Sequence, residues 1–398
     1  MRYIPLAKLY YSDTEHYDAI YSQRFNSESA YRFDFNISKN PAFFVFTPEL
    51  FELMELILEL NTRITTLANN LPNIALKQYN KKCLIDEIHL TNDIEGVVST
   101  RNEINEALEE TQKPNSKQRK RFHGLVLKYI MLLKKEDIPL KKCQDIRNLY
   151  DDFILEEIKE ENPKNVPDGL YFRQGHVDVV SRSGKVIHHG LYPETDIITM
   201  MEQSLDLLNN PSYNSLIRIA IFHYLFAYIH PFYDGNGRMT RFISSYMLSQ
   251  KLHELTGFRL SYTIKKNIDQ YYKSFKITNN PKNKGDLTPF VINFFEILVF
   301  LLEDLYSSLE KRSNQMEYYF FLAKKYASAD SKEKRILDVL IMNTLFGENG
   351  FSIEDLVCIT ETGESKVRSF ITKLKELNLV KTKKEGRKHL YDIDLSKL

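Results

Sequence analysis

The chain has 398 residues, of which 43% are hydrophobic, so it can form two or three domains with sizeable cores. Its net charge of +1 provides no overall field that would attract nucleic acid or a membrane surface. We expect a soluble, cytoplasmic protein for three reasons. The three cysteines have no paired spacing, and the start lacks the apolar region of a signal peptide. The apolar runs are too short for a membrane span.

Residues 1–115 are predicted to form an N-terminal region that precedes a helical core. Its first part is rich in tyrosine and phenylalanine and is expected to be irregular. Apolar periodicity then predicts helices from about Thr47 to Leu67 and from Asn80 to Glu95.

The second of these helices ends in a short pattern that carries a carboxylate. Thr91 and Glu95 are four residues apart and therefore share one face of the helix, and Gly96 is suited to end it. By itself this pattern is typical of an ordinary solvated helix end.

A basic stretch at 113–121 connects the N-terminal region to the core, which is predicted to cover residues 116–310. Such a stretch can contact phosphate, but it is more typical of a solvated loop that leads into a helix.

Within the core, residues 176–189 contain two short β-branched runs around Ser183 and Gly184, which predict a hairpin. His188 and His189 are interpreted as residues of this hairpin and not as metal ligands. The reason is that no cysteine or second histidine cluster lies at zinc-like spacing.

An apolar run from Leu216 to Ile229 predicts a buried helix, and His230 follows at its end. Because Pro231 disfavours helical dihedral angles at the preceding residue, His230 is expected at the junction between helix and loop. A second helical pattern begins near Arg238, with Arg241 one turn further along the same face.

The stretch from His230 to Arg241 has the sequence HPFYDGNGRMTR, which suits the binding of a polyphosphate beside a base. His230 has an ordinary pKa of about 6.5 and can accept a proton near neutral pH. Asp234 offers hard oxygen ligands of the kind that bind Mg²⁺ between phosphate oxygens.

The rest of the stretch supplies hydrogen-bond donors for an anion. Gly235 and Gly237 allow backbone amides to converge at a helix N-terminus, and Asn236 lies between them to hold an α-phosphate. Arg238 and Arg241 offer forked donors for the β- and γ-phosphates. The alternative is a glycine-rich corner between helices whose arginines are merely solvated, and the combined spacing disfavours it.

Residues 330–398 are predicted to form a winged helix-turn-helix domain. Its predicted helices are Lys332–Asn343, Ile353–Cys358, capped by Ser352, and Ser365–Leu377. Two short strands on either side of residues 383–388 form the predicted wing. Residues 331–398 contain 13 Lys and Arg against 11 Asp and Glu, a weak basic excess that favours docking or homodimerisation somewhat over DNA binding.

The central stretch resembles the signature of the Fic family, HxFx[D/E]GNGRxxR, at every specified position. The matching residues are His230, Phe232, Asp234, Gly235, Asn236, Gly237, Arg238 and Arg241. The resemblance implies a mainly α fold and the transfer of AMP from ATP, with Mg²⁺, onto a Ser, Thr or Tyr hydroxyl of a target protein or of the chain itself. It also implies that His230 is the catalytic base, that Asp234 binds the metal, and that the remaining polar residues bind the phosphates.

Residues 91–96, Thr-Asn-Asp-Ile-Glu-Gly, resemble the inhibitory motif of the same family, [S/T]xxxE[G/N]. The resemblance implies that Glu95 pairs with Arg241 and occupies the place of the γ-phosphate, so that the resting enzyme is inhibited. The same carboxylate could instead activate water and remove AMP from a modified target, so the reverse reaction stays open, as does transfer of another phosphate-containing group.

Two further regions take expected roles from the resemblance. The hairpin at 176–189 is expected to be a flap that binds a target segment through main-chain hydrogen bonds. Residues 267–272 are expected near the adenine, with Tyr272 as the preferred contact and a buried tyrosine pair as the alternative. The rival interpretation of the whole chain is a DNA-binding regulator that senses nucleotide through an inactive core.

Overall fold

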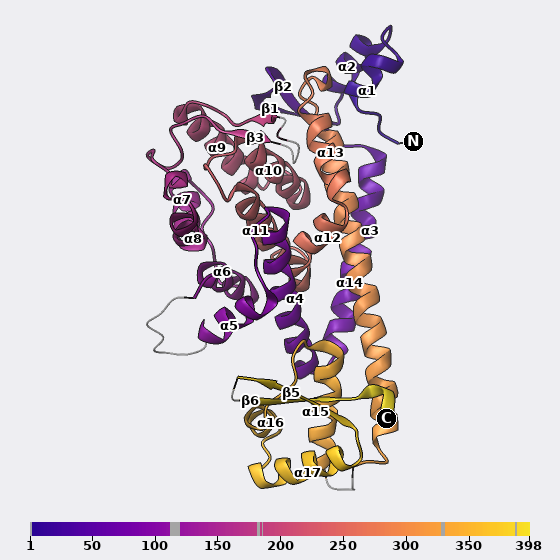
Figure 1. Ribbon diagram of the computed structural model, residues 1–398. Coiled ribbons are helices and arrows are strands. Elements are labelled where there is room, and N and C mark those ends of the chain that lie inside the picture. Colours follow the sequence, from indigo (N-terminus) through magenta and orange to yellow (C-terminus); the bar gives the residue numbers. More distant parts are fainter. Residues whose placement is uncertain (1, 112–119, 181–183, 185, 328–330, 387) are drawn as a thin grey trace. The chain divides into compact units, whose positions relative to one another are not determined.

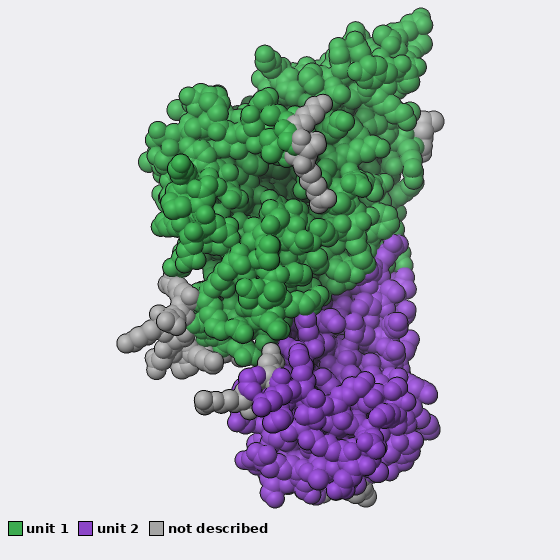
Figure 2. All heavy atoms as spheres, viewed as in Figure 1, with its two compact units in different colours: residues 1–61, 85–302 green, residues 62–84, 303–398 purple. Residues whose placement is uncertain are grey.

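The computed structural model describes residues 2–111, 120–180, 184, 186–327, 331–386 and 388–398. They form two compact units, which are coloured separately in Figure 2. Unit 1 comprises residues 1–61 and 85–302, and unit 2 comprises residues 62–84 and 303–398. The long helices α3 (Pro48–Asn70), α4 (Asn73–Ile94) and α14 (Thr288–Ala323) contribute residues to both units.

The fold is mainly α, as predicted, and the described residues contain three separate antiparallel hairpins (Figure 1). α4 begins seven residues earlier than predicted and ends at Ile94, so Glu95 lies in the turn directly after the helix. None of the helices in the described residues combines the length and hydropathy needed to cross a bilayer.

The expectation of an irregular N-terminal start was wrong. This part contains α1 (Leu6–Ser12), α2 (Tyr17–Phe25) and a hairpin of β1 (Ala30–Ile37) with β2 (Asn40–Val45). Ile37 pairs with Asn40, so the turn is Ser38-Lys39, and both of its residues have positive φ, 48° and 69°. Such turns usually carry Asn or Gly, so the sequence did not indicate a hairpin here.

The rest of unit 1 is a helical core built around α10 (Ser215–Ile229), which packs against α9 (Glu194–Asn209) and α11 (Asn236–Ser249) (Figure 1). The other helices are α5 (Arg101–Thr111), α6 (His123–Leu133), α7 (Cys143–Phe153), α8 (Leu155–Glu161), α12 (Leu260–Lys266) and α13 (Ile268–Thr278). Short 3₁₀ turns occur at Pro163–Asn165, Glu254–Phe258 and Pro281–Asn283.

α10 is buried on nearly all sides, in agreement with its continuous apolar sequence. Its first turn is capped by Asn214, whose side-chain oxygen accepts hydrogen bonds from the amides of Leu216 (2.9 Å) and Ile217 (3.4 Å). The cap at Asn214 and the proline after Ile229 define the two ends of α10, and His230 therefore lies directly after its last turn.

The predicted hairpin in the core is confirmed. β3 (Asp178–Val180) pairs with β4 (Val186–His189) in antiparallel fashion, with Asp178 opposite His189. Val180 and Ile187 are more than half exposed on it. Most of the predicted Ser-Gly turn falls outside the described residues, as does most of the basic stretch at 113–121.

The C-terminal part of unit 2 contains the helices and strands expected from the sequence. They are α15 (Ser331–Phe346), α16 (Ile353–Thr360), α17 (Glu364–Glu376), β5 (Val380–Glu385) and β6 (Lys388–Ile393), with a last turn at Leu395–Lys397. Ser352 caps α16, since its hydroxyl accepts from the amide of Asp355 at 3.1 Å.

Candidate active site

His230 ends α10 in a strained backbone conformation. Its φ of 54° and ψ of 60° lie in the left-handed region, which costs a non-glycine residue roughly 1–2 kcal/mol. Pro231 disfavours the helical alternative, and the two backbone polar groups of His230 are both satisfied. Its amide donates to Phe226 at 3.0 Å, and its carbonyl accepts from Arg173 Nε at 2.9 Å. Strain held in this way presents the imidazole at the junction between helix and loop.

Arg173 is the residue that holds this junction together. Its side chain is fully buried and donates to three carbonyl groups, those of His230, Gly175 and Leu191, while its amide donates to Pro231. One side chain thus connects the His230 loop to the residues on both sides of the β3–β4 hairpin. The sequence contains no signal for this role, because the three carbonyls come from separate segments.

The surroundings of His230 favour the neutral form of its imidazole and lower its pKa. Burial and the nearby His188 together lower its pKa to about 4, while the Glu95 carboxylate opposes this shift. His188 itself is fixed by a 2.6 Å contact between its Nε2 and the carbonyl of Tyr228. A neutral imidazole has a lone pair, so His230 is able to accept a proton.

The loop after His230 leads into the N-terminus of α11. Gly235 has a φ of 80°, a conformation that glycine adopts without strain. The Asn236 side chain donates to the carbonyl of Phe232 (2.7 Å) and accepts from its amide (2.9 Å), so it clamps the loop. Backbone amides of the first helical turn have no partner within the helix, and they form an anion-binding end.

Glu95 and Arg241 form an ion pair at this end of α11, with Glu95 Oε1 2.8 Å from Arg241 Nη2. The carboxylate also lies against Gly237, since a Cβ added to that glycine would lie 2.0 Å from Glu95 Oε1. Arg241 is 2% exposed and Glu95 28% exposed, so the pair is only partly open to solvent. A carboxylate therefore occupies the space beside Gly237 in the first turn of α11.

α4 contributes two more groups that face Arg241. Thr91 accepts from Arg241 through both its hydroxyl (2.9 Å, from Nε) and its carbonyl (3.0 Å, from Nη2). One turn earlier, the buried Glu87 carboxylate interacts with the Arg241 charge and accepts from the amide of Ser261 at 2.9 Å. Glu87 was missed, although its spacing of four and eight residues from Thr91 and Glu95 would have revealed it.

Arg238 differs from Arg241 in its partner. Its Nη1 pairs with Glu157 on α8, and both side chains are buried. Burial raises the pKa of Glu157, and the Arg238 charge opposes this shift. Arg238 Nε and Nη2 are buried and have no hydrogen-bond partner among the described residues. Glu157 was also missed, because nothing in its local sequence links it to the signature.

Asp234 lies in the loop between His230 and α11. Its Oδ1 accepts from the amide of Gly235 at 2.5 Å, and its Oδ2 lies 3.5 Å from Asn165 Nδ2. The described residues contain no group of three His, Cys, Asp or Glu that could hold a metal alone. A single oriented carboxylate fits Mg²⁺ that takes its remaining ligands from phosphates and water.

The two tyrosines at 271 and 272 have different environments. Tyr272, the predicted adenine contact, is 47% exposed on α13, whereas Tyr271 is buried. The alternative of a buried pair therefore describes Tyr271 alone. Burial raises the pKa of Tyr271 and the Arg241 charge opposes this shift, so α13 faces the site through the tyrosine that the sequence analysis did not select.

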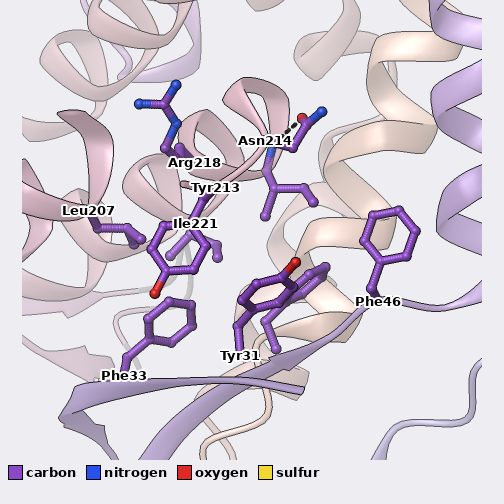
Figure 3. Close-up of a pocket in the computed structure, with 10 residues that line it drawn as sticks. Tyr31, Phe33, Phe46, Leu207, Tyr213, Asn214, Arg218 and Ile221 are labelled. Carbon is purple, nitrogen blue, oxygen red and sulfur yellow. Dashed lines mark hydrogen bonds between the residues drawn. The ribbon is translucent and has the colours of Figure 1, made fainter. Parts of the chain in front are cut away.

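A hollow elsewhere in unit 1 is lined by different residues (Figure 3). It lies between the β1–β2 hairpin and helices α9 and α10, and aromatic side chains including Tyr31, Phe33 and Tyr213 surround it. None of the signature residues lines it. Its mostly apolar walls do not suit a polyphosphate, so it is separate from the candidate site.

Part of this geometry lies in a segment that is similar to known proteins. Residues 140–248 match the model of the Fic/DOC family. The chain is 28% identical to a protein adenylyltransferase Fic of Drosophila grimshawi over 235 residues, covering 55% of this chain and 42% of that protein. It is 32% identical to the protein of the same name from Drosophila mojavensis over 126 residues, covering 29% and 23%. The chain thus spans less than half the length of these relatives.

A solved structure resembles the chain more widely. A Fic family protein from Desulfovibrio desulfuricans G20 aligns with a TM-score of 0.52 at 20% identity, covering 88% of this chain and 97% of that one. At this level of identity the similarity concerns the fold, which is mainly helical in both.

Proposed function

We propose that this chain, whose residues 140–248 form a Fic/DOC family domain, transfers AMP from ATP to a hydroxyl side chain of a target protein, and that Glu95 keeps this activity low. The observation that carries the proposal is the position of Glu95. Its carboxylate pairs with the Arg241 guanidinium and lies against Gly237 in the first turn of α11, within electrostatic reach of His230. An anion is therefore already bound where a polyphosphate would place one beside a base.

In the proposed reaction, the target hydroxyl enters beside the flap and gives its proton to His230. The hydroxyl oxygen then bonds to the α-phosphorus of ATP, and the bond from that phosphorus to the oxygen of the β-phosphate breaks. Pyrophosphate leaves with its charge balanced by Arg241 and by the two unpaired donors of Arg238. Bound Mg²⁺, held by Asp234, would neutralise part of the phosphate charge.

Inhibition follows from competition for one set of donors. Arg241 binds Glu95 in the resting state, and a γ-phosphate needs the same guanidinium and the same space beside Gly237. Both cannot be present together. The nucleotide therefore binds either without its γ-phosphate in place or after Glu95 has moved.

Labelling with α-³²P-ATP tests the proposal. Glu95→Gly is expected to increase self-labelling or labelling of proteins in a lysate at least tenfold, because a competing ion pair is lost. His230→Ala in the same background is expected to abolish it. Absence of label in Glu95→Gly with every nucleoside triphosphate would exclude the transfer reaction. Intact mass after incubation with ATP, CTP, GTP or UTP identifies the transferred group.

The reverse reaction is a second candidate. Glu95 is 28% exposed and interacts with His230, so it is placed to activate a water molecule and remove AMP from a modified target. A target first modified by the Glu95→Gly protein is the substrate for this test. Release of AMP by the unmodified chain and not by Glu95→Gly is the result that this reaction requires.

The rival role as a DNA-binding regulator has less support. Several basic side chains of unit 2 already have acidic partners: Lys373 with Glu333 (3.3 Å), Arg368 with Glu364 (2.7 Å) and Lys381 with Asp394 (3.1 Å). These pairs reduce the charge available to phosphate.

A further inference from the structure

The guanidinium of Arg238 has only one of its three nitrogens paired with a protein acceptor. Arg238 is fully buried on α11, and its Nη1 donates to Glu157 Oε1 on α8. Its Nε and Nη2 are buried without a hydrogen-bond partner in the part of the chain that the structure describes. Few buried donors in native proteins lack an acceptor, because the hydrogen bonds they lose to water must be replaced. These two donors therefore indicate a ligand that brings acceptors of its own.

The two unpaired nitrogens lie on the same edge of the guanidinium. Nε and Nη2 direct parallel N–H groups to one side of the planar group, and such a fork binds two oxygens of one anion. Glu157 uses Nη1, away from this edge, and leaves the fork complete. Arg241 is different, because its Nε donates to Thr91 (2.9 Å) and its Nη2 pairs with Glu95 (2.8 Å).

The element that carries Glu157 also supports the loop at the start of α11. Tyr150 on α7 stacks on Phe232, with ring centroids 3.8 Å apart. Ile154, between α7 and α8, lies against Gly235, since a Cβ added to that glycine would be 3.1 Å from Ile154 Cδ1. Glu157 follows three residues later. The position of Glu157 is therefore fixed relative to the loop and to the N-terminus of α11.

We propose that Glu157 is a positioning residue that holds the Nε–Nη2 fork of Arg238 toward the β-phosphate, so that the site prefers nucleoside diphosphates and triphosphates to monophosphates. This inference rests on the proposed function, because it assigns the β-phosphate to Arg238. Glu157 does not touch the nucleotide and acts through Arg238 alone.

Glu157 has two opposite effects on phosphate binding, and two substitutions separate them. Its oxygen orients the guanidinium, whereas its negative charge weakens the attraction of Arg238 for a phosphate. Glu157→Gln keeps an oxygen acceptor and removes the charge, while Glu157→Ala removes both. If charge alone mattered, both variants would bind a diphosphate more tightly. Positioning predicts tight binding for the Gln variant and weak binding for the Ala variant.

The test is the ratio of ADP to AMP affinity, measured by calorimetry with Mg²⁺. Glu95→Gly combined with His230→Ala is the parent protein, which is uninhibited and without turnover. Adding Glu157→Ala is expected to weaken ADP binding about tenfold, the value of one hydrogen bond to a charged group, and to leave AMP binding unchanged. Adding Glu157→Gln is expected to give at least the parent ratio. Unchanged AMP affinity also shows that a variant is folded.

Glu161→Ala is the matched control. Glu161 lies one turn further along α8 and pairs with Arg121 at 2.9 Å, so its loss removes the same charged group from the same helix without touching Arg238. Its ratio is expected to equal that of the parent. If Glu157→Ala does not fold, Glu157→Met replaces it, since Met fills the volume without an oxygen acceptor, and the same loss is expected.

The possible failures are distinct. If the parent protein binds neither nucleotide, the proposed function fails and the inference falls with it. If both bind and Glu157→Ala has the parent ratio or a higher one, Glu157 only balances charge and the positioning role is wrong. A Gln variant as weak as the Ala variant also overturns it, because an oxygen at this position would then not orient Arg238. An equal loss in Glu161→Ala would assign the effect to the charge of α8 as a whole and overturn the role of the pair.

Discussion

Glu95 and Gly237 are in direct contact: a Cβ on Gly237 would lie 2.0 Å from Glu95 Oε1, closer than real atoms approach. The glycine has ordinary helical dihedral angles as the second residue of α11, so it is not needed for a turn. Its lack of a side chain leaves room for an anion beside the helix N-terminus. The carboxylate of Glu95 uses that room in the resting state.

Gly237→Ala separates the two consequences of this contact. The added methyl group displaces Glu95 and weakens its pair with Arg241, yet it also fills the space proposed for the phosphate. We therefore expect Gly237→Ala to show no gain in AMP transfer, in contrast to Glu95→Gly. Labelling rates of both variants and of the double variant provide the measurement. Activation by Gly237→Ala alone would show that the phosphate binds elsewhere.

The charge and the volume of Glu95 can also be separated. Glu95→Gln keeps the shape and can still accept from Arg241, but it loses the ionic part of the pair. We expect its labelling rate to lie between those of the unmodified chain and Glu95→Gly, since an ionic hydrogen bond is worth about 1 kcal/mol more than a neutral one. Equal rates for Gln and Gly would mean that charge alone inhibits. A Gln variant as slow as the unmodified chain would mean that volume alone does.

The pH profile of transfer is expected to follow from the lowered pKa of His230. Burial and His188 lower the pKa of its imidazole to about 4, so the free enzyme keeps a neutral base far into acid. For Glu95→Gly, kcat/KM is expected to lose activity near pH 4 and not near the ordinary value of about 6.5. Initial rates over a constant-ionic-strength pH series measure this. An acid limb near the ordinary value would mean that His230 is solvated in the active state.

The parts of the site that are local in sequence were predictable, and the parts that depend on tertiary contacts were not. The stretch from His230 to Arg241 places its groups through one helix end, one loop and one helix start, and each has a recognisable signal. Glu157 and Arg173 meet the stretch from distant segments whose local sequences are ordinary. Their roles follow only from which helices pack together.

The fold shows the same division between strong and weak local signals. Long apolar periods predicted α10 and the helices of the C-terminal segment to within a few residues. The β1–β2 hairpin was missed because its turn uses Ser38 and Lys39 in place of residues that favour positive φ. The hydrogen bonds between β1 and β2 compensate for the strain of this turn. The sequence of one strand alone does not show which other strand it pairs with.

Glu87 is expected to make the stability of unit 1 depend on pH. Its carboxyl group is completely buried and interacts with the Arg241 charge. Burial raises its pKa from 4.5 to about 7, although hydrogen bonds from Ser261 oppose this shift. Between these two values the folded protein holds a proton that the unfolded chain has released. The free energy of unfolding therefore falls as the pH rises through this window, by on the order of 3 kcal/mol in total.

Glu87→Gln removes this dependence, because an amide does not titrate and can still accept from the Ser261 amide. Hydrogen exchange of the α10 amides, corrected for intrinsic rates, measures the opening free energy of the unit 1 core without contributions from unit 2. The exposed Glu52→Gln is the control and is expected to retain the slope of the unmodified chain. If Glu87→Gln keeps the same slope as this control, the Glu87 carboxyl group is ionised throughout the window and its charge is balanced by Arg241 inside the core.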